Sequence, residues 1–134
     1  MDEPISDEPL VPNVDPAVVE TIHAELQALR ARHGRLTMPV LSAYPQLVQI
    51  CGEGDLLEAH IAFQREMARY INGSKYEAAA ALSIMSEADT VLDRLTLAAE
   101  RFDYQDQRTM RRWSDRGLRT IAGDLVAIAA ARGR

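Results

Sequence analysis

Apolar residues recur every three or four positions along most of this chain, and this spacing limits the possible folds more than any other feature. Residues on one side of a helix are three or four positions apart, whereas residues on one side of a strand are two apart. No run of the sequence alternates apolar and polar residues as a half-buried strand does. Alanine and leucine, which favour helices, are also abundant. The sequence therefore predicts an all-α protein.

Capping residues and stop signals divide the chain into separate helices. Asp15 followed by Pro16 is typical of a helix start, and Gly34 is typical of a helix end. Ser74 and Glu77 match a capping box, in which each side chain bonds the other residue's free amide. We expect a compact bundle of five to six helices. The longer ones span about 16–33, 56–71, 75–85, 90–102 and 106 onward, with short helical turns near 39–41 and 47–50.

The apolar stripe of each long helix predicts which residues face the core. The predicted inward residues are Val18, Val19, Ile22, Leu26 and Leu29 in the first helix; Leu57, Ile61, Gln64, Met67, Ala68 and Ile71 in the second; Leu92, Leu95, Ala98, Ala99 and Phe102 in the fourth; and Met110, Trp113, Gly117, Ile121, Leu125 and Ile128 in the last. Gly117 and Gly123 leave two alternatives open in the last helix. Either they let another helix approach closely, or the helix breaks at Gly117.

Charge is distributed unevenly along the chain. Residues 1–14 hold three prolines, four acidic residues and no basic one, so we expect a disordered acidic tail. The whole chain has a formal net charge of −5, yet residues 101–134 contain eight arginines against four aspartates. A basic end on an acidic body favours a polyanionic partner, or an acidic surface within the same protein.

Arginines of the last predicted helix form a second stripe, apart from its apolar one. Arg108, Arg112, Arg116 and Arg119 are spaced by 4, 4 and 3 residues, and Arg111 flanks them. A helix with a core face on one side and arginines on another can dock in the major groove of DNA. There, guanidinium groups bind phosphates or the O6 and N7 acceptors of guanine.

The segment Leu97-Ala98-Ala99-Glu100-Arg101-Phe102, a short turn and Arg108-Thr109-Met110-Arg111-Arg112-Trp113 resemble a helix-turn-helix. In that family a small residue, here Ala99, lies where the helices cross, and a bulky apolar residue, here Phe102, ends the first helix. Asp103 stands where the family usually has a glycine in the left-handed conformation. The run from Arg111 to Leu118 is similar to C-terminal segments of small actinobacterial regulators.

This resemblance implies a small DNA-binding or transcription-regulatory protein that binds duplex DNA as a homodimer. The residues that would contact DNA are Gln107, Arg108, Arg111, Arg112, Arg116 and Arg119. Together with the composition and the helix signals, it divides the expected chain into a disordered acidic tail (1–14), a helical body (15–86) and a helix-turn-helix-like pair packed on that body (87–134).

A charged helix face is more commonly just a solvated surface, and the sequence supports that alternative too. Asp115 lies four residues from both Arg111 and Arg119, which is the spacing of helical ion pairs. In this alternative the protein is a helical protein–protein interaction module, an adaptor or effector-associated domain that binds no nucleic acid. Its alanine-rich helix and its last helix would then contact a partner protein.

The sequence lacks the signatures of an enzyme. Cys51 is the only cysteine, and no residue stands in a nucleophile motif. Glu20 and His23 form one Glu-x-x-His step, whereas di-iron bundles use two, so we expect no metal site and no cofactor. The acidic N-terminus is unlike an export signal, and no apolar run approaches the length of a membrane span. We therefore expect a non-enzymatic cytoplasmic protein without membrane contact.

Overall fold

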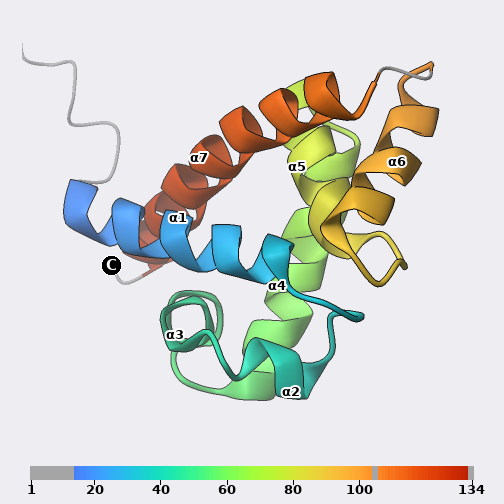
Figure 1. Cartoon of the computed structure of the whole chain (residues 1–134). Coiled ribbons are helices and arrows are strands. Elements are labelled where there is room, and N and C mark those ends of the chain that lie inside the picture. Colours follow the sequence, from blue (N-terminus) through green and yellow to red (C-terminus); the bar gives the residue numbers. More distant parts are fainter. Residues whose placement is uncertain (1–13, 104–105, 133–134) are drawn as a thin grey trace, which may run out of the picture.

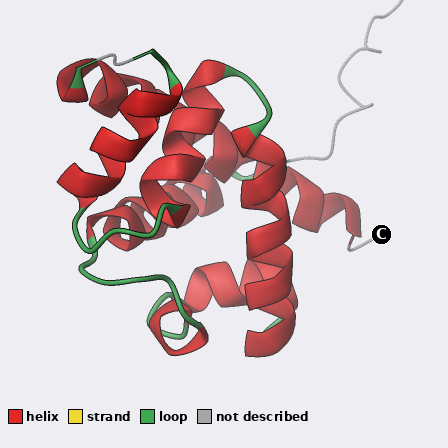
Figure 2. Cartoon of the chain, turned by 90° about the vertical axis from the view of Figure 1, so that its right-hand side faces the viewer, coloured by secondary structure: helices red, strands yellow, loops and turns green. Residues whose placement is uncertain are grey.

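The computed structural model describes residues 14–103 and 106–132, and these residues form seven α-helices without a strand (Figures 1 and 2). The helices are α1 (Pro16–Ala31), α2 (Met38–Leu41), α3 (Pro45–Gly52), α4 (Leu56–Ile71), α5 (Lys75–Met85), α6 (Val91–Arg101) and α7 (Gln107–Arg132). The predicted all-α class is confirmed, and the count reaches seven because the single turn α2 and the short α3 are both helices. Apart from Val14, the predicted tail lies outside the described residues.

Most of these helices begin at a residue that caps them through its side chain. In each case a side-chain oxygen accepts a hydrogen bond from an amide two or three residues further on, which satisfies a donor that has no partner within the helix. These caps are Asp15 on α1, Thr37 on α2, Asp55 on α4, Ser74 on α5 and Thr90 on α6. At α7, Asp106 accepts in the same way from the amide of Thr109, at 2.8 Å.

The alanine-rich helix α5 lies at the centre of the bundle and packs against α4, α6 and α7. Its alanines at positions 78–81 are at most 2% exposed. A methyl carbon added to Gly117 of α7 would overlap the backbone carbonyl of Tyr76, so the two helix backbones touch here. Helix α7 continues through Gly117 and Gly123, and close approach is therefore the role of Gly117. The α5 alanines contact this chain's own helices, so they present no surface to a partner.

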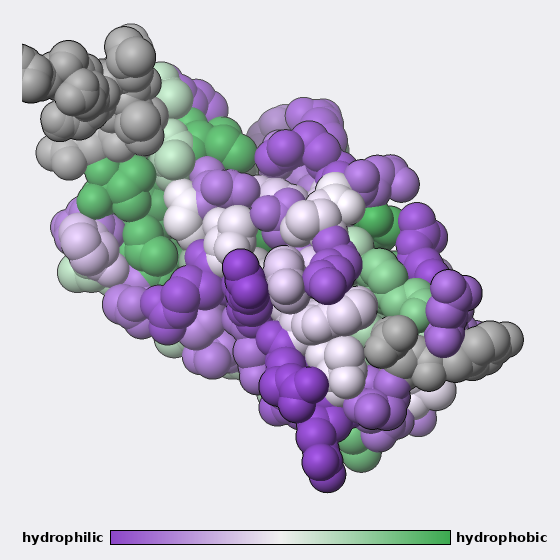
Figure 3. Space-filling model, turned by 90° about the horizontal axis from the view of Figure 1, so that it is seen from above, coloured by the Kyte–Doolittle hydropathy of each residue, from purple (hydrophilic) through white to green (hydrophobic). Residues whose placement is uncertain are grey.

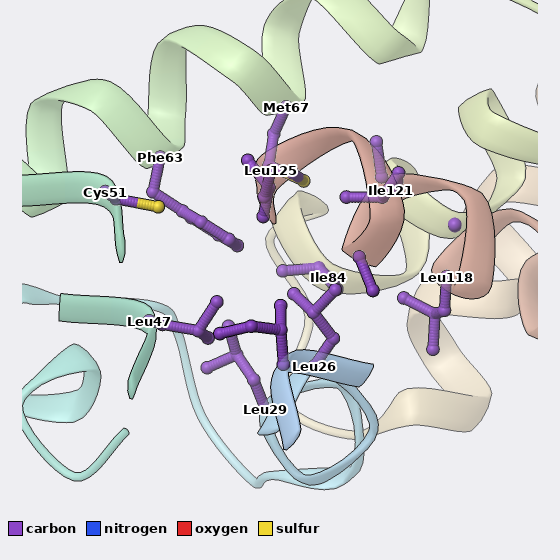
Figure 4. Close-up of a cluster of buried hydrophobic side chains, with 14 of the residues drawn as sticks. Leu26, Leu29, Leu47, Cys51, Phe63, Met67, Ile84, Leu118, Ile121 and Leu125 are labelled. Atoms are coloured by element: carbon purple, nitrogen blue, oxygen red, sulfur yellow. The ribbon is translucent and has the colours of Figure 1, made fainter. Parts of the chain in front are cut away.

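The main hydrophobic core draws side chains from α1, α3, α4, α5 and α7, with Leu41 of α2 (Figure 4). A smaller cluster joins α5 to α6 and to the start of α7 through Ala79, Leu95, Ala98, Ala99 and Met110. Helix α7 thus contributes to both clusters, because Leu118, Ile121 and Leu125 belong to the main one. The division of the chain between residues 86 and 87 stays a prediction.

Several residues predicted to face the core are exposed instead. They are Val18 (40% exposed), Leu57 (54%), Ile61 (42%), Leu92 (55%) and Ile128 (37%), together with Gln64 and Ala68, which are also exposed. In α4 the buried face runs through Ala59, Phe63, Met67 and Tyr70. Leu57 and Ile61 lie on a second apolar face of this helix. The face carrying the two aromatic rings is the buried one, because those rings remove more apolar area from water.

Arg94 of α6 is fully buried and joins three parts of the chain. Its guanidinium donates to the carbonyl oxygens of Ser83 (2.8 Å), Ala88 (2.6 Å), Arg30 (2.7 Å) and Arg32 (2.9 Å). These carbonyls lie at or just beyond the C-terminal ends of α1 and α5, where helix dipoles place negative charge. Burial lowers the pKa of Arg94, while the nearby Asp89 and Asp93 act in the opposite direction. Arg94 therefore closes two helix ends with one side chain.

Candidate nucleic-acid interface

All six predicted DNA-contacting residues lie on the exposed side of the first half of α7. Arg108, Arg112 and Arg116 are each one helical turn apart, which spreads them over about 12 Å along one face. We call these three residues the arginine ridge. Figure 3, seen from above Figure 1, shows strongly hydrophilic residues interspersed with near-neutral ones across the middle of this view, with apolar surface mainly at the upper left and on the right.

The opposite side of α7 is the buried one, and it is wider than the predicted stripe. Met110, Gly117, Ile121 and Leu125 are buried as predicted, whereas Trp113 is only half-buried and Ile128 is exposed. Four further residues are also buried: Ser114, Leu118, Ala122 and Val126. The buried side is wide because α7 packs against α5 on one flank and α1 on the other. This packing leaves the ridge side as the surface that α7 presents to solvent.

None of the three residues of the ridge has an acidic partner within 4 Å in the described part of the chain. No carboxylate there lies within 4 Å of Arg108 or Arg112. Arg116 also lacks an acidic partner there, and its guanidinium lies 4.1 Å from the centre of the Tyr76 ring. No ion pair within 4 Å in these ranges therefore neutralises the ridge, although the charge of Arg108 is one of the causes that lower the pKa of the nearby Asp106.

Aromatic residues and a lysine border the ridge on the side of α5 and α6. Trp113 meets the rings of Tyr76 and Phe102 edge to face, with centroids 6.1 and 5.5 Å away. Lys75 lies 4.7 Å from the centre of the Trp113 ring, which adds a fourth cation beside the ridge. The sequence did not suggest Lys75, because it lies two helices earlier, at the start of α5, and nothing in its local pattern signals the contact.

Arg111 is drawn toward Asp115, at 3.8 Å, so this predicted ion pair is present but long. Asp115 makes a closer contact with the buried Arg30, at 2.7 Å. Arg30 also donates to the hydroxyl of Ser114 at 2.7 Å, and that hydroxyl lies 2.9 Å from the hydroxyl of Ser83. Burial lowers the pKa of Arg30, and Asp115 opposes the shift. Asp115 thus serves the packing of α1 on α7.

Arg119 pairs with α1 rather than with Asp115. Its guanidinium donates to Glu20 at 2.6 Å and lies 3.4 Å from Nδ1 of His23. The hydrogen bond and the charge of Arg119 hold the pKa of Glu20 below its usual value. Glu20 and His23, the two ends of the Glu-x-x-His step, therefore contact an arginine of their own chain. Within the described ranges, no three side chains of metal-ligand type lie together.

Burial, and secondarily the charge of Arg119, holds the pKa of His23 below its usual value. The unfolded chain therefore binds a proton at this histidine at higher pH than the folded chain does. We expect stability to fall as the pH drops from about 7 to 5, a window set by the usual histidine pKa of about 6.5. Melting temperatures at pH 7.5, 6.5 and 5.5 measure this effect. The pH dependence should weaken in His23→Gln, and an unchanged pH dependence would contradict the assignment.

Gln107 is held against α6 instead of projecting outward. Its amide nitrogen donates to the hydroxyl of Thr96, and it also donates to the carbonyl oxygen of Leu92 at 3.3 Å. Its amide is therefore occupied within the fold, unlike the guanidinium groups of the ridge.

The turn between α6 and α7 has one feature in common with the predicted motif. Asp103 has a φ of 62°, the left-handed conformation that a glycine would adopt in that place. Ala99 is buried at 7% exposure, and Phe102 caps the end of α6. Residues 104 and 105 lie outside the described residues. The helix-turn-helix resemblance stays a prediction.

The structure thus defines an all-α bundle with a cationic ridge on α7. Compared with protein-family models, curated proteins and solved structures, the chain gives no significant match. The described helices include none with the length and apolar character that crossing a bilayer requires.

A groove of about 500 Å³ lies between α1, α3 and the end of α7, lined by Val18, Ile22, Gln46, Gln49, Ile50 and Arg132 among others.

Proposed function

We propose that this protein is a small non-enzymatic DNA-binding protein that contacts duplex DNA through the arginine ridge. One observation carries the proposal. Arg108, Arg112 and Arg116 lie exposed on one face of a rigid helix, without a neutralising carboxylate within 4 Å in the described part of the chain. Like charges one helical turn apart repel each other by about 0.2–0.5 kcal/mol per pair, and a polyanion bound along the ridge would relieve that repulsion.

The ridge suits DNA in both charge and shape. The three guanidinium groups span about 12 Å of helix, because each residue adds about 1.5 Å. DNA carries phosphates closely spaced along its backbone, so the three groups can each meet one. An α-helix also fits the major groove, where arginine binds guanine O6 and N7 in a bidentate manner. The core face of α7 anchors the helix through Met110, Leu118 and Ile121, so the ridge is presented in a fixed orientation.

Salt dependence gives the first test. With about three phosphates neutralised, the affinity for a labelled 20-base-pair duplex should fall about 40-fold between 50 and 200 mM salt. In Arg108→Ala/Arg112→Ala/Arg116→Ala the affinity at 50 mM salt should fall about tenfold or more. The salt slope, which is the slope of log affinity against log salt concentration, should flatten by about three. Fluorescence anisotropy measures both quantities. Stability should change by roughly 1 kcal/mol or less, because all three residues are exposed.

A matched triple variant separates a local effect from a change in net charge. Arg35, Arg65 and Arg69 are also exposed and lie away from the ridge, on the α1–α2 connection and on α4. Their replacement by alanine removes the same total charge and should leave the salt slope near that of the wild type. An equal loss of duplex affinity in both triple variants would exclude the proposal. So would the absence of duplex binding by the wild type at 50 mM salt.

A second candidate function, a protein–protein interaction module, is favoured by one observation. Leu57 and Ile61 lie one turn apart on α4, and they are 54% and 42% exposed. Contiguous exposed apolar area is a feature of surfaces that another protein covers, and these two neighbouring side chains are where α4 offers it. If two copies meet here, sedimentation velocity should show a dimer that Leu57→Asp/Ile61→Asp converts to monomer. A wild-type monomer at 100 μM would exclude self-association through this face.

A further inference from the structure

Arg119 belongs to the same side of α7 as the arginine ridge, although it contacts α1. It follows Arg108 by eleven residues, which at about 100° per residue places it within about 20° of Arg108 around the helix axis. Its guanidinium is drawn away from the ridge by Glu20, at 2.6 Å. With Arg119 released, the line of cations on α7 would gain a fourth member. Glu20 therefore limits the charge of the ridge.

His23 makes this contact sensitive to protonation. Nδ1 of His23 lies 3.4 Å from Nη2 of Arg119, and it accepts a hydrogen bond from a guanidinium only while it is itself unprotonated. A protonated His23 has donors on both ring nitrogens and a positive charge that repels Arg119. The same charge attracts Glu20, which then has a competing partner. Protonation thus weakens both contacts that hold Arg119.

The other charged groups around His23 act in both directions. From α1, Glu20 favours the protonated ring and Arg30 opposes it. From α7, Asp115 favours protonation and Arg119 opposes it. Asp115 is held by Arg30 at 2.7 Å, so its charge is largely balanced. Arg119 is the opposing group with an exposed side chain, and it can move into solvent when the ring gains a proton.

We propose that Glu20 and His23 form an acid-opened clasp that determines whether Arg119 joins the arginine ridge. This inference rests on the proposed function, since it assigns a regulation to the same surface. Neutral His23 keeps the clasp closed, and its buried position, with 8% exposure, favours the neutral form. By linkage, a polyanion that takes Arg119 also makes protonation of His23 easier.

Duplex binding at pH 7.5 and at pH 5.5, under matched ionic strength, tests the clasp. In the wild type the slope of log affinity against log salt concentration should be steeper at the lower pH, toward a limit of about 0.9 as His23 takes up its proton, which corresponds to one added phosphate contact. In Glu20→Gln the ion pair is lost, so the steeper slope should already be present at pH 7.5. In His23→Gln the amide oxygen still accepts from Arg119 and does not titrate, so the slope should be the same at both pH values.

His23→Gln also serves as the control for protonation elsewhere in the protein, because it retains the two other histidines, His33 and His60. If its slope steepens at pH 5.5 as much as that of the wild type, the clasp is excluded. An unchanged slope in Glu20→Gln at pH 7.5 would exclude it as well.

A measurement without DNA keeps this inference separate from the proposed function. The Nε–H signal of Arg119 in the NMR spectrum should shift with the same midpoint as the ring of His23 in the wild type, and should not shift in His23→Gln. If this coupling is found but no duplex binds, the clasp holds and the proposed function fails. If DNA binds while the Arg119 signal ignores the protonation of His23, the proposed function holds and the clasp is overturned.

Discussion

Replacing Arg94 with methionine is expected to lower the free energy of unfolding by about 3–5 kcal/mol. The side chain is fully buried and donates four hydrogen bonds to carbonyl oxygens at or just beyond the C-terminal ends of two helices, α1 and α5. Methionine fills much of the volume but donates nothing, so the four carbonyls would lose this donor, and two of the lost hydrogen bonds, to Ser83 and Arg30, are buried. Each unsatisfied buried group costs about 1–3 kcal/mol, and relaxation of the helix ends recovers part of the total. Urea unfolding followed by circular dichroism measures the loss.

Two further substitutions show whether the donors of Arg94 are responsible. Arg94→Lys keeps a positive charge, but a single ammonium group cannot donate to all the carbonyls that the planar guanidinium reaches in different directions. Most of the loss of stability should therefore remain. Arg101→Met removes an exposed arginine from the same helix and should change stability by about 0.5 kcal/mol or less. A fully stable Arg94→Met variant would show that the carbonyls find other donors, and the structural role assigned to Arg94 would be wrong.

Gly117→Ala is expected to destabilise the bundle by about 3 kcal/mol, whereas Gly123→Ala is expected to stabilise it by about 0.5–1 kcal/mol. The new methyl carbon at position 117 would overlap the Tyr76 carbonyl and lie 2.9 Å from the side chain of Ala80. Both neighbours belong to α5, and the nearer one is backbone, so α7 would have to move away. At position 123 a methyl carbon meets nothing within 4 Å. Only the gain in helix propensity remains there.

The two glycines form a matched pair, because they lie in one helix and undergo the same chemical change. In thermal and urea unfolding, the midpoint should fall for Gly117→Ala and rise for Gly123→Ala. Equal stabilisation of both would mean that α5 and α7 do not touch as closely as the structure shows. A lower stability of both variants would mean that a methyl group is not accommodated at Gly123 either.

Local signals in the sequence predicted the helices well, because these signals act within a few residues. Asp15 and Ser74 cap the helices that they were expected to begin, since each side chain bonds an amide at most three positions away. Choosing the buried face of a helix was harder. Helix α4 carries apolar residues on two faces, and which one meets α5 depends on distant segments, so Leu57 and Ile61 were placed wrongly.

Buried arginines were the features that the sequence could not reveal. Arg30 and Arg94 look like ordinary charged helix residues, and their partners lie 84–85 and 6–64 positions away, respectively. The arginine spacing on α7 did identify one exposed face, but only the fold shows how its members differ. Gln107 bonds to α6, Arg119 bonds to Glu20, and Arg108 and Arg112 extend without such contacts among the described residues. Those differences arise from α1 and α6, which the spacing along α7 does not encode.

The central claim is that duplex DNA binds on the arginine ridge, and amide chemical-shift mapping by NMR tests it most directly. On addition of a 20-base-pair duplex at 50 mM salt, we expect the largest shifts in α7 between Arg108 and Arg119, with smaller ones at Lys75 and Tyr76. We expect little change around Leu57 and Ile61 of α4 or in the groove lined by Ile50. Shifts centred on α4 or on that groove, or no shifts at all, would contradict the account.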